Sequence, residues 1–238
     1  IVATGAKEYQ PSEYLYPESE RVVTQVELSD RLEEKGAKDL DSVVMIQCVG
    51  SRNEENVNCS RLCCQSAVKN ALALKKLNPD TAIYILYRDM RTYGLLEDYY
   101  KEAREKGIIF IRFAQEAPPE VTSTDDGLTI FVKDHILQRK LAISADLLAL
   151  SAGVVAEDTD ELGRIMKLNR NPEGLFIEAH VKLRPVDMPG DGIFLCGTAH
   201  GPKLISESIA KAQAAASRAT TFLPRSEIKL SRITSKVD

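Results

Sequence analysis

The stretch Ser42–Val49, with the sequence SVVMIQCV, decides how the rest of the chain is interpreted. Such a continuous run of β-branched and other apolar residues is typical of a strand buried on both faces in a parallel sheet. Ser60–Leu77 then predicts a helix, Thr81–Tyr87 (TAIYILY) a second buried strand, Leu95–Lys106 a second helix and Ile108–Phe113 a third strand. This order indicates a mononucleotide-binding half of a doubly wound, Rossmann-like α/β fold.

The other predicted elements are placed by shorter patterns. Before the first strand we expect one short helix. After the third strand we expect an antiparallel meander, a further buried strand, and then a short helix, a strand and a long helix. The ranges are a helix at Val26–Glu34, meander strands at Leu128–Val132 and Leu141–Ile143, a buried strand at Ala145–Ala152, a short helix at Leu162–Leu168, a strand at Gly192–Cys196 and an Ala-rich helix at Ile205–Phe222.

Composition excludes several classes of function. The 238 residues carry a net charge of −4 with both signs well mixed, which argues against a nucleic-acid binder held by a basic field. No apolar run is long enough to span a bilayer, and no secretory signal opens the sequence. We therefore expect a cytoplasmic protein with no direct membrane insertion.

Four of the five cysteines fall within a short segment, at Cys48, Cys59, Cys63 and Cys64. In a doubly wound fold, the end of the first strand, the following loop and the first turn of the next helix meet at the carboxyl edge of the sheet, where ligands bind. Four thiolates at one place suit zinc or a 4Fe–4S cluster. The positive end of the helix favours the cluster, because a thiolate-ligated cluster is a net anion.

The same loop lacks the residues of a dinucleotide site. A G-x-G-x-x-G run lets the backbone approach a pyrophosphate, whereas Gln47–Arg52 contains one glycine. We expect the half-Rossmann unit to hold a cluster where a nicotinamide cofactor would otherwise bind. Arg88 and Asp89 end the second strand and are interpreted as a solvated strand end.

Two short motifs far apart in the sequence indicate a flavin site. Ala3-Thr4-Gly5 follows an apolar stretch, and Ile193–Gly197 is a strand that ends in glycine before the last helix. Flanking a nucleotide-binding-like insert, they match a flavoprotein whose first dinucleotide domain is interrupted and then resumes. Flavoproteins of this kind usually carry Asp after the final glycine, whereas this chain has Thr198. Near Ser208, the N-terminus of the last helix is expected to stabilise negative charge on a reduced flavin.

Two further residues lie beside the second motif. Cys196 is interpreted as a buried core residue at a strand end. His200 follows the turn and has two interpretations: a solvated or hydrogen-bonded loop histidine, or a proton relay at the flavin edge. His135 and His180 are interpreted as surface residues.

Val44–Arg52, Asn58–Cys64, Tyr87–Gly94 and Gly192–Ala216 together resemble the A subunit of heterodisulfide reductase, and the resemblance runs over nearly the whole chain. The A subunit of quinone-interacting membrane-bound oxidoreductases shares the pattern. The resemblance implies a thioredoxin-reductase-like fold that holds FAD. It implies that the four clustered cysteines bind a 4Fe–4S cluster. The flavin contacts that it implies are Ala3, Thr4, Gly5, Gly197, Thr198, Ser208 and Ile209.

The resemblance also implies a domain organisation in which the first FAD half would precede Ile1. The chain then reads as a fragment, inactive by itself, whose uncovered apolar surfaces (Ile1–Gly5 and Leu147–Phe222) favour self-association. The expected divisions are 1–40 (end of the first FAD half plus a connector), 41–153 (nucleotide-binding-like domain with the cysteines), 154–223 (returning FAD half) and 224–238 (linker).

In this family, the flavin splits an electron pair between ferredoxin and the disulfide-reducing subunits. The implied partners are other subunits of a heterodisulfide-reductase-like or quinone-linked complex, with ferredoxin or hydrogenase as electron partners. Two alternatives stay open: an NAD(P)-dependent thiol–disulfide flavoprotein reductase that uses Cys63 and Cys64, and a zinc-stabilised binding module without redox chemistry.

Overall fold

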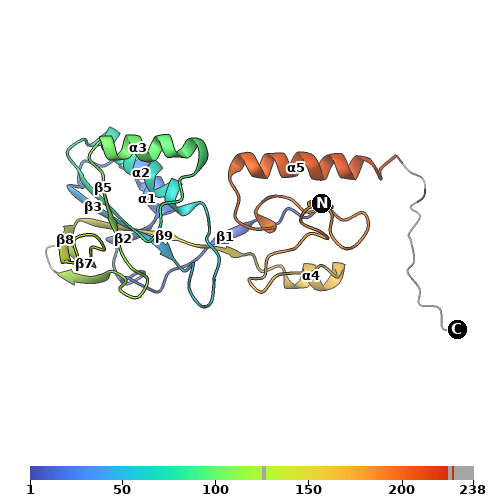
Figure 1. Ribbon diagram of the computed structural model, residues 1–238, viewed down its shortest axis with the longest axis horizontal. Coiled ribbons are helices and arrows are strands. Elements are labelled where there is room, and N and C mark those ends of the chain that lie inside the picture. The colour runs from blue at the N-terminus through green and yellow to red at the C-terminus, as the bar shows by residue number, and fades with distance from the viewer. Residues whose placement is uncertain (125–126, 225–226, 228–238) are drawn as a thin grey trace. The chain divides into compact units, whose positions relative to one another are not determined.

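The computed structural model describes residues 1–124, 127–224 and 227. It contains two compact units: unit 1 consists of Ile1–Lys7 and the chain from Val155 onward, and unit 2 is Glu8–Val154. The chain passes between the units along β1 (Ala6–Glu8) and β10 (Val154–Ala156), which pair with each other (Figure 1). Each unit is built around its own hydrophobic clusters.

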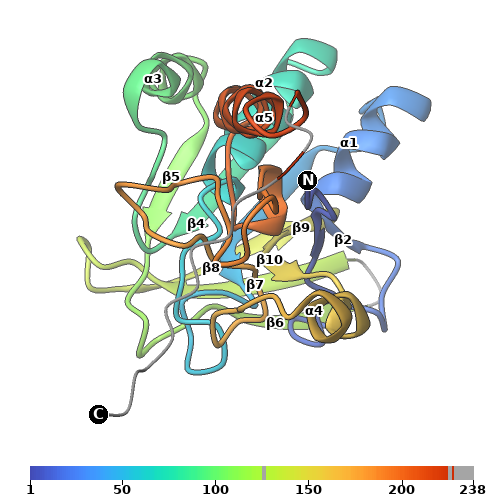
Figure 2. The same cartoon turned by 90° about the vertical axis from the view of Figure 1, so that its right-hand side faces the viewer.

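Unit 2 is built on a five-stranded, fully parallel sheet in the order β2-β9-β3-β4-β5. Three helices cover one face of this sheet, and a three-stranded antiparallel meander covers the other (Figures 1 and 2). The sheet strands are β2 (Val22–Thr24), β3 (Ser42–Val49), β4 (Ala82–Tyr87), β5 (Ile109–Arg112) and β9 (Leu147–Ala152). The covering elements are α1 (Gln25–Glu34), α2 (Cys63–Leu77), η1 (Gly94–Leu96), α3 (Glu97–Glu105), β6 (Glu120–Thr124), β7 (Gly127–Lys133) and β8 (Lys140–Ala145).

Strand β3 is buried on both faces, as its sequence predicts. Val43 and Met45 pack against the helices, whereas Val44 and Ile46 pack against the meander. This division follows from the two-residue period of a strand, which sends successive side chains to opposite faces. The predicted strand–helix–strand–helix–strand order is confirmed, with helices on one face only.

The first domain boundary differs from the prediction that placed residues 1–40 outside the nucleotide-binding-like domain. Residues from Glu8 onward belong to unit 2, because β2 pairs with β9 and α1 packs against α2. Thr24 starts α1 with a capping box: its hydroxyl accepts from Glu27 N at 3.3 Å, and its own N–H donates to the Glu27 carboxylate at 2.7 Å. Leu28 and Leu32 then enter the core. What reads as a polar connector in the sequence is therefore an integral part of the sheet and its helical layer.

Three other expectations on unit 2 need adjustment. Helix α2 begins at Cys63, three residues later than predicted. Strand β6 was not predicted, because its sequence EVTST has no buried side chain and shows no apolar pattern. Strand β9 is buried at every residue, so the apolar surface expected from Leu147 onward does not include it.

Unit 1 contains α4 (Asp160–Met166), η2 (Gly197–Ala199) and α5 (Ile205–Thr220). The strand predicted at Gly192–Cys196 is present only as isolated bridges, Val2 with Leu195 and Asp187 with Phe194, because no neighbour among the described residues pairs with it for longer. Most of the predicted linker at 224–238 lies outside the described residues. Several large apolar side chains of unit 1 are exposed: Ile1, Ile165, Val181, Leu183, Ile205, Ile209 and Leu223.

Replacing Leu148 with Ala tests whether the sheet core of unit 2 carries its stability. Leu148 lies on β9, is 0% exposed and packs against the meander. We expect Leu148→Ala to lower the free energy of unfolding by about 2–5 kcal/mol, because it leaves a cavity. Leu137, which is 60% exposed, is the matched control, and Leu137→Ala should change stability by less than about 0.5 kcal/mol. Equal losses in urea unfolding would contradict this packing.

Candidate functional site

The cysteine corner of unit 2 begins with an irregularity in β3. Pairing with β9 shifts register between Ile46 and Val49, and Cys48 adopts a left-handed φ of 66°. Bulges of this kind redirect a side chain and are frequent beside functional sites. Positive φ is costly for a residue with a Cβ, so the surrounding structure has to hold Cys48 in place. The irregular end of β3 therefore sets the direction in which the Cys48 thiol points.

The other three cysteines lie on the loop and helix that follow β3, as predicted. Cys59 Sγ accepts a hydrogen bond from Arg61 N at 3.3 Å. Cys63 and Cys64 open α2, and their thiols face the carbonyl oxygens of Ala152 at 3.5 Å and Asp89 at 3.7 Å. Those carbonyls lie at the carboxyl ends of β9 and β4. Three strand ends and one helix start thus meet at this corner.

The N-terminus of α2 has no side-chain cap. Its N-cap residue, Leu62, makes no side-chain hydrogen bond to the first turn. The first backbone N–H groups of a helix have no partner within the helix, and they favour an anion. The corner therefore combines thiols with a helix end that suits negative charge.

Burial keeps the helix thiols protonated in the free chain. It raises the pKa of Cys64 to about 11, and it raises the pKa of Cys63 well above its ordinary range, with the neighbouring cysteines adding to both shifts. All five cysteines are free, so no disulfide joins them. Within the described ranges, no group of three or more His, Cys, Asp or Glu side chains is arranged to hold a metal ion. The thiols thus share one corner without being gathered around a common point.

Arginine side chains fasten the loop that carries the cysteines. Arg52 donates to Cys48 Sγ at 3.9 Å and forms an ion pair with Asp89 at 2.6 Å. Arg88 donates to the carbonyl oxygens of Arg52 and Ser51 at 3.0 and 3.2 Å. The hydrogen bond from Arg52, with the charges of Arg112 and other arginines, lowers the pKa of Asp89. Arg88 and Asp89 are therefore not a merely solvated strand end: they hold the loop in place.

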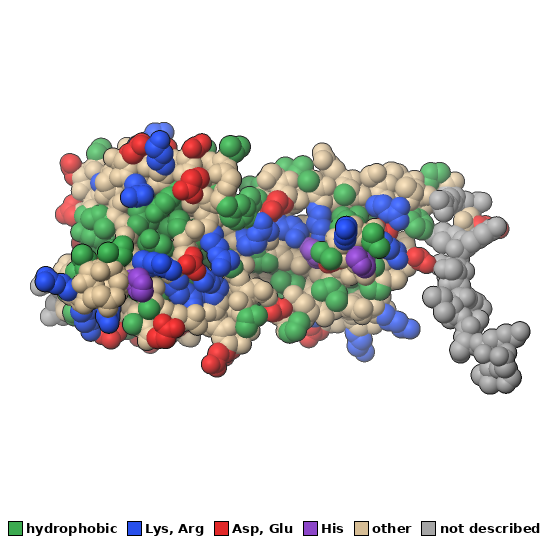
Figure 3. All heavy atoms as spheres, in the orientation of Figure 1, with side chains coloured by type: hydrophobic (Ala, Val, Ile, Leu, Met, Phe, Trp, Pro, Cys, Tyr) green, Lys and Arg blue, Asp and Glu red, His purple; other side chains and the backbone are tan. Residues whose placement is uncertain are grey.

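Lysine and arginine side chains gather on the visible face of unit 2 (Figure 3). Within the cysteine loop, the guanidinium of Arg61 contacts the Tyr93 hydroxyl at 2.5 Å. Arg52 donates to a thiol, so its charge can compensate a negative cluster directly. The backbone at both arginines is left-handed, with φ of 58° at Arg52 and 60° at Arg61.

The loop also approaches neighbouring segments closely. Gly50 has φ of 64°, and a Cβ there would lie 2.1 Å from the Tyr9 ring. At Gly153, a Cβ would lie 2.8 Å from the Gly50 carbonyl oxygen. Gly153 N donates to Val49 O at 2.7 Å, which ties the end of β9 to the end of β3. Gly50 is needed because the Tyr9 ring lies against it, and Gly153 is needed because the Gly50 backbone lies against it.

The two predicted flavin motifs come together in unit 1. Val2 N donates to Phe194 O at 2.6 Å, and Cys196 N donates to Val2 O at 3.1 Å, so Ala3-Thr4-Gly5 follows a segment paired with the second motif. A Cβ at Gly5, whose φ is 84°, would lie 4.0 Å from Thr198 Oγ1. Gly5 and the Gly197-Thr198 turn are therefore neighbours.

The two flavin-contact residues predicted on the last helix follow the Gly197-Thr198 turn in the sequence. Ser208 is in the first turn of α5, where its N donates to Leu204 O at 2.9 Å, and Ile209 begins the second turn and is 54% exposed. Cys196 is buried, as expected for a core residue. The structure thus places all seven predicted flavin residues in unit 1.

His200 has charged partners that sequence reasoning missed. Its Nε2 contacts the Glu178 carboxylate, and its Nδ1 lies 2.5 Å from Lys211 Nζ. Glu178 and Lys211 are 22 and 11 residues away, and neither forms a motif with His200. Only the folded chain brings these three residues together.

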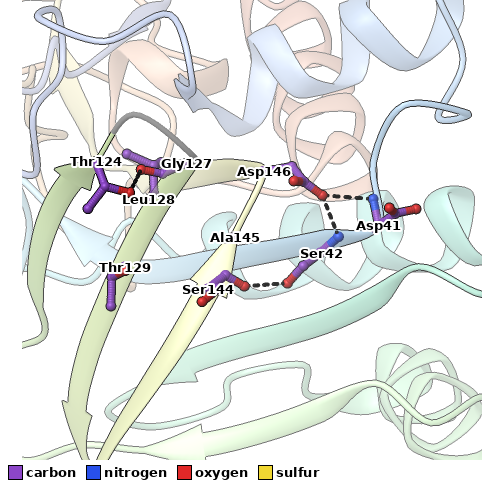
Figure 4. A pocket seen from close by; sticks show the side chains of 9 residues that line it. All are labelled: Asp41, Ser42, Thr124, Gly127, Leu128, Thr129, Ser144, Ala145 and Asp146. Atoms are coloured by element: carbon purple, nitrogen blue, oxygen red, sulfur yellow. Dashed lines mark hydrogen bonds between the residues drawn. The ribbon is translucent and has the colours of Figure 1, made fainter.

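A polar pocket lies at the start of β3 and β9, and Figure 4 shows the residues that line it. The Asp146 carboxylate accepts from the backbone N–H groups of Asp41 and Ser42 at 2.8 and 2.9 Å. The Ser42 hydroxyl donates to Ser144 O at 2.8 Å. Ligands of open α/β sheets bind at the carboxyl ends of strands, whereas this pocket lies at the amino ends of β3 and β9. Its polar groups serve to join those strands.

Comparison with known proteins agrees with the motifs. The A subunit of the ferredoxin:CoB-CoM heterodisulfide reductase of Methanosarcina acetivorans is 36% identical in an alignment that covers 94% of this chain and 33% of that protein. The chain is related over its length to the A subunit of heterodisulfide reductase. The A subunit of the H2/formate:CoB-CoM heterodisulfide,ferredoxin reductase of Methanococcus maripaludis is 37% identical, with coverage of 100% and 39%. The iron-sulfur A subunit of the CoB–CoM heterodisulfide reductase of Methanocaldococcus jannaschii is 36% identical, with the same coverage. The chain therefore spans well under half of each of these relatives.

Solved structures confirm the predicted fold. Thioredoxin reductase from T. acidophilum superposes with a TM-score of 0.63 at 14% identity, covering 93% of this chain and 64% of that one. The Lactococcus lactis thioredoxin reductase gives 0.61 at 19% identity with the same coverage. No protein-family model matches the chain. In the part of the chain that the structure describes, every helix is too short or too polar to cross a membrane.

Replacing Gly50 with Ala tests the close approach of the cysteine loop to Tyr9. Gly36→Ala is the control, because Gly36 has φ of 73° but nothing within 4 Å of a Cβ. Both changes place a side chain at positive φ, which costs about 1–2 kcal/mol. We expect Gly50→Ala to cost roughly 1–3 kcal/mol more, because the added carbon overlaps the ring. Equal changes in the free energy of unfolding would show that Tyr9 does not constrain this loop.

Proposed function

We propose that the chain is part of a cytoplasmic, iron–sulfur flavoprotein oxidoreductase of the same kind as the A subunit of heterodisulfide reductase. The observation that carries the proposal is the cysteine corner: four free thiols at the ligand-binding edge of a dinucleotide-type sheet whose glycine fingerprint is absent. Similarity to that family supports it, and one relative's name includes the words iron-sulfur. The chain would carry electrons rather than bind a nicotinamide cofactor in unit 2.

The donor set at the corner fits a 4Fe–4S cluster. Cys48, Cys59, Cys63 and Cys64 would hold it, and a bound cluster would accept and release single electrons. The raised pKa of Cys64, to about 11, means that metal binding has to displace the thiol proton. Arg52 and the uncapped start of α2 would then offset the negative charge of the thiolates. The thiols have to move together on binding, since they are not gathered around one point.

The residues of unit 1 fit one side of a flavin site. Gly5 leaves room beside the Thr198 hydroxyl, and Gly197 has φ of 68° with nothing within 4 Å of a Cβ. Thr198 can donate a hydrogen bond where flavoproteins of this kind usually carry Asp. Ala3, Thr4, Ser208 and Ile209 would complete this side. A bound FAD would exchange electron pairs for single electrons, and the chain's residues would orient it.

The proposed partners are the other subunits of a heterodisulfide-reductase-like or quinone-linked complex, with ferredoxin or hydrogenase as electron partners. The names of two relatives include ferredoxin as a reaction partner, which supports this choice. We also propose that the chain supplies only part of the complete FAD site and is inactive alone. The exposed apolar side chains of unit 1 would then favour self-association.

Two other functions account for less of the structure. An NAD(P)-dependent thiol–disulfide reductase would need a phosphate-binding turn, whereas Gly50 is the one glycine in Gln47–Arg52 and is packed against Tyr9. A zinc-stabilised module would use the same four thiols but leaves the paired motifs of unit 1 without a role. Metal analysis distinguishes the zinc-stabilised module from an iron–sulfur flavoprotein, and NADPH titration tests the thiol–disulfide reductase.

Iron and acid-labile sulfide measured on anaerobically reconstituted protein test the proposal. We expect about four of each per chain, lost when Cys63 and Cys64 are both changed to serine. Cys196→Ser is the matched control: Cys196 is also a buried free thiol, but it lies in unit 1, so this variant should keep the full content. Stoichiometric zinc without sulfide would favour the binding module. Equal loss in both variants would sink the assignment of the corner.

A further inference from the structure

Glu178, His200 and Lys211 form a linked group in unit 1. His200 lies between the other two, with Nε2 against the Glu178 carboxylate and Nδ1 2.5 Å from Lys211 Nζ. The side chains of His200 and Glu178 are only 20% and 12% exposed. We call this group the proton trio.

The contacts determine where the protons lie. A lysine ammonium has donors only, so His200 Nδ1 accepts from Lys211. Nε2 then carries the ring proton and donates it to the Glu178 carboxylate. A proton can pass from Lys211 to His200 without changing the total charge of the trio. This arrangement can therefore store a proton and pass it on.

The charges around the trio make its proton easier to release. Burial, together with Lys203, lowers the pKa of Lys211 to about 8, opposed by Glu178 and Cys196. Burial and then Lys211 lower the pKa of His200, with Lys203 adding and Glu178 opposing. Burial of Glu178 is outweighed by its backbone hydrogen bond, by His200 and by Lys211, so its pKa is lowered. Lys211 is thus the member whose proton is exchanged near neutral pH.

The trio is attached to the flavin motif from two sides. His200 N donates to Gly197 O at 3.3 Å and closes the Gly197–Ala199 turn. Phe176 N, two residues before Glu178, donates to Ala199 O at 3.0 Å. Lys211 comes from the second turn of α5. A change of charge at the turn therefore acts on all three groups at short range.

We propose that Glu178, His200 and Lys211 form a proton site whose affinity for a proton rises when electrons reach a flavin held at the Gly197–Ala199 turn. The proposal rests on the proposed function. A flavin bound there would become more negative by one charge on taking up two electrons and one proton. A second proton then passes from water to the Lys211 amine. Below the pKa of Lys211 that amine is already protonated, so the second proton is taken up only above about pH 8.

The competing interpretation is a structural tie between α5 and the loop that carries Glu178. A tie of this kind would not respond to electrons at the turn. A proton site would gain a proton there, because a negative charge raises the pKa of a neighbouring amine. The two are therefore separated by measurements that follow protons rather than stability.

Histidine nitrogen NMR on the full chain tests the proton arrangement. The chain has three histidines, so His200→Gln assigns the signal, and exposed His180 serves as reference. We expect neutral His200 with its proton on Nε2. Lys211→Met should raise the pKa of His200 and Glu178→Gln should lower it, following the sign of the charge removed. A His200 signal that titrates like His180 and ignores both variants would overturn the trio.

The pH dependence of the flavin reduction potential tests the coupling. Between about pH 8 and the higher pKa that Lys211 acquires beside a reduced flavin, the flavin-loaded protein should take up one more proton per electron pair than it does below pH 8. Lys211→Arg keeps the positive charge but cannot lose its proton, so it should abolish the extra uptake while the protein stays folded. Lys182→Met, at an exposed lysine of unit 1, should behave as the parent.

Two outcomes of the potential measurement contradict the proposal. If Lys211→Arg and the parent show the same pH dependence, the trio is a structural tie. If reduction leaves the His200 signal unchanged above about pH 8, no proton follows the electrons. Protein that binds no flavin even when the rest of the FAD site is supplied would instead contradict the proposed function and the coupling with it, while the NMR result on proton sharing would stand.

Discussion

The parallel pairing of β3 with β9 and β4 is the constraint on which the cysteine corner depends. Parallel strands end at the same edge, so Cys48, Ala152 and Asp89 are brought together although they are far apart in the sequence. The thiols of Cys63 and Cys64 then face the carbonyls that β9 and β4 leave at that edge. A register slip of one residue would exchange the side chains that face the helices with those that face the meander.

The loop after β3 replaces the glycine-rich turn of a nucleotide site with a longer, fastened segment. Asn56 Nδ2 donates to Gly50 O at 3.1 Å, and the Ser60 hydroxyl accepts from Val154 N at 2.8 Å. Cys48 and Arg52, which both carry a Cβ, have positive φ, so strain is concentrated where the thiols are presented. Such a loop does not leave the open backbone that a pyrophosphate needs, but together with α2 it brings four cysteines to the edge where ligands bind.

Sequence reasoning succeeded where the pattern is local. The apolar run of β3 and the helix that starts with two cysteines both follow from short-range periodicity, and they place Cys48, Cys59, Cys63 and Cys64 at one edge. It failed where pairing partners are distant in the sequence. Val22–Thr24 is a strand because β9 lies beside it, and polar β6 is a strand because β7 does. Glu178 and Lys211 reach His200 only through the folded backbone of unit 1, so no motif marks them.

We propose that the cysteine corner holds an iron–sulfur cluster in place of a dinucleotide. X-ray absorption at the iron edge of anaerobically reconstituted protein tests it most directly, because it reports the atoms bound to the metal. The account predicts iron surrounded by sulfur, with a second shell of iron neighbours, and the loss of both when the corner cysteines become serine. Iron bound through nitrogen or oxygen, or a metal without iron neighbours, would contradict it.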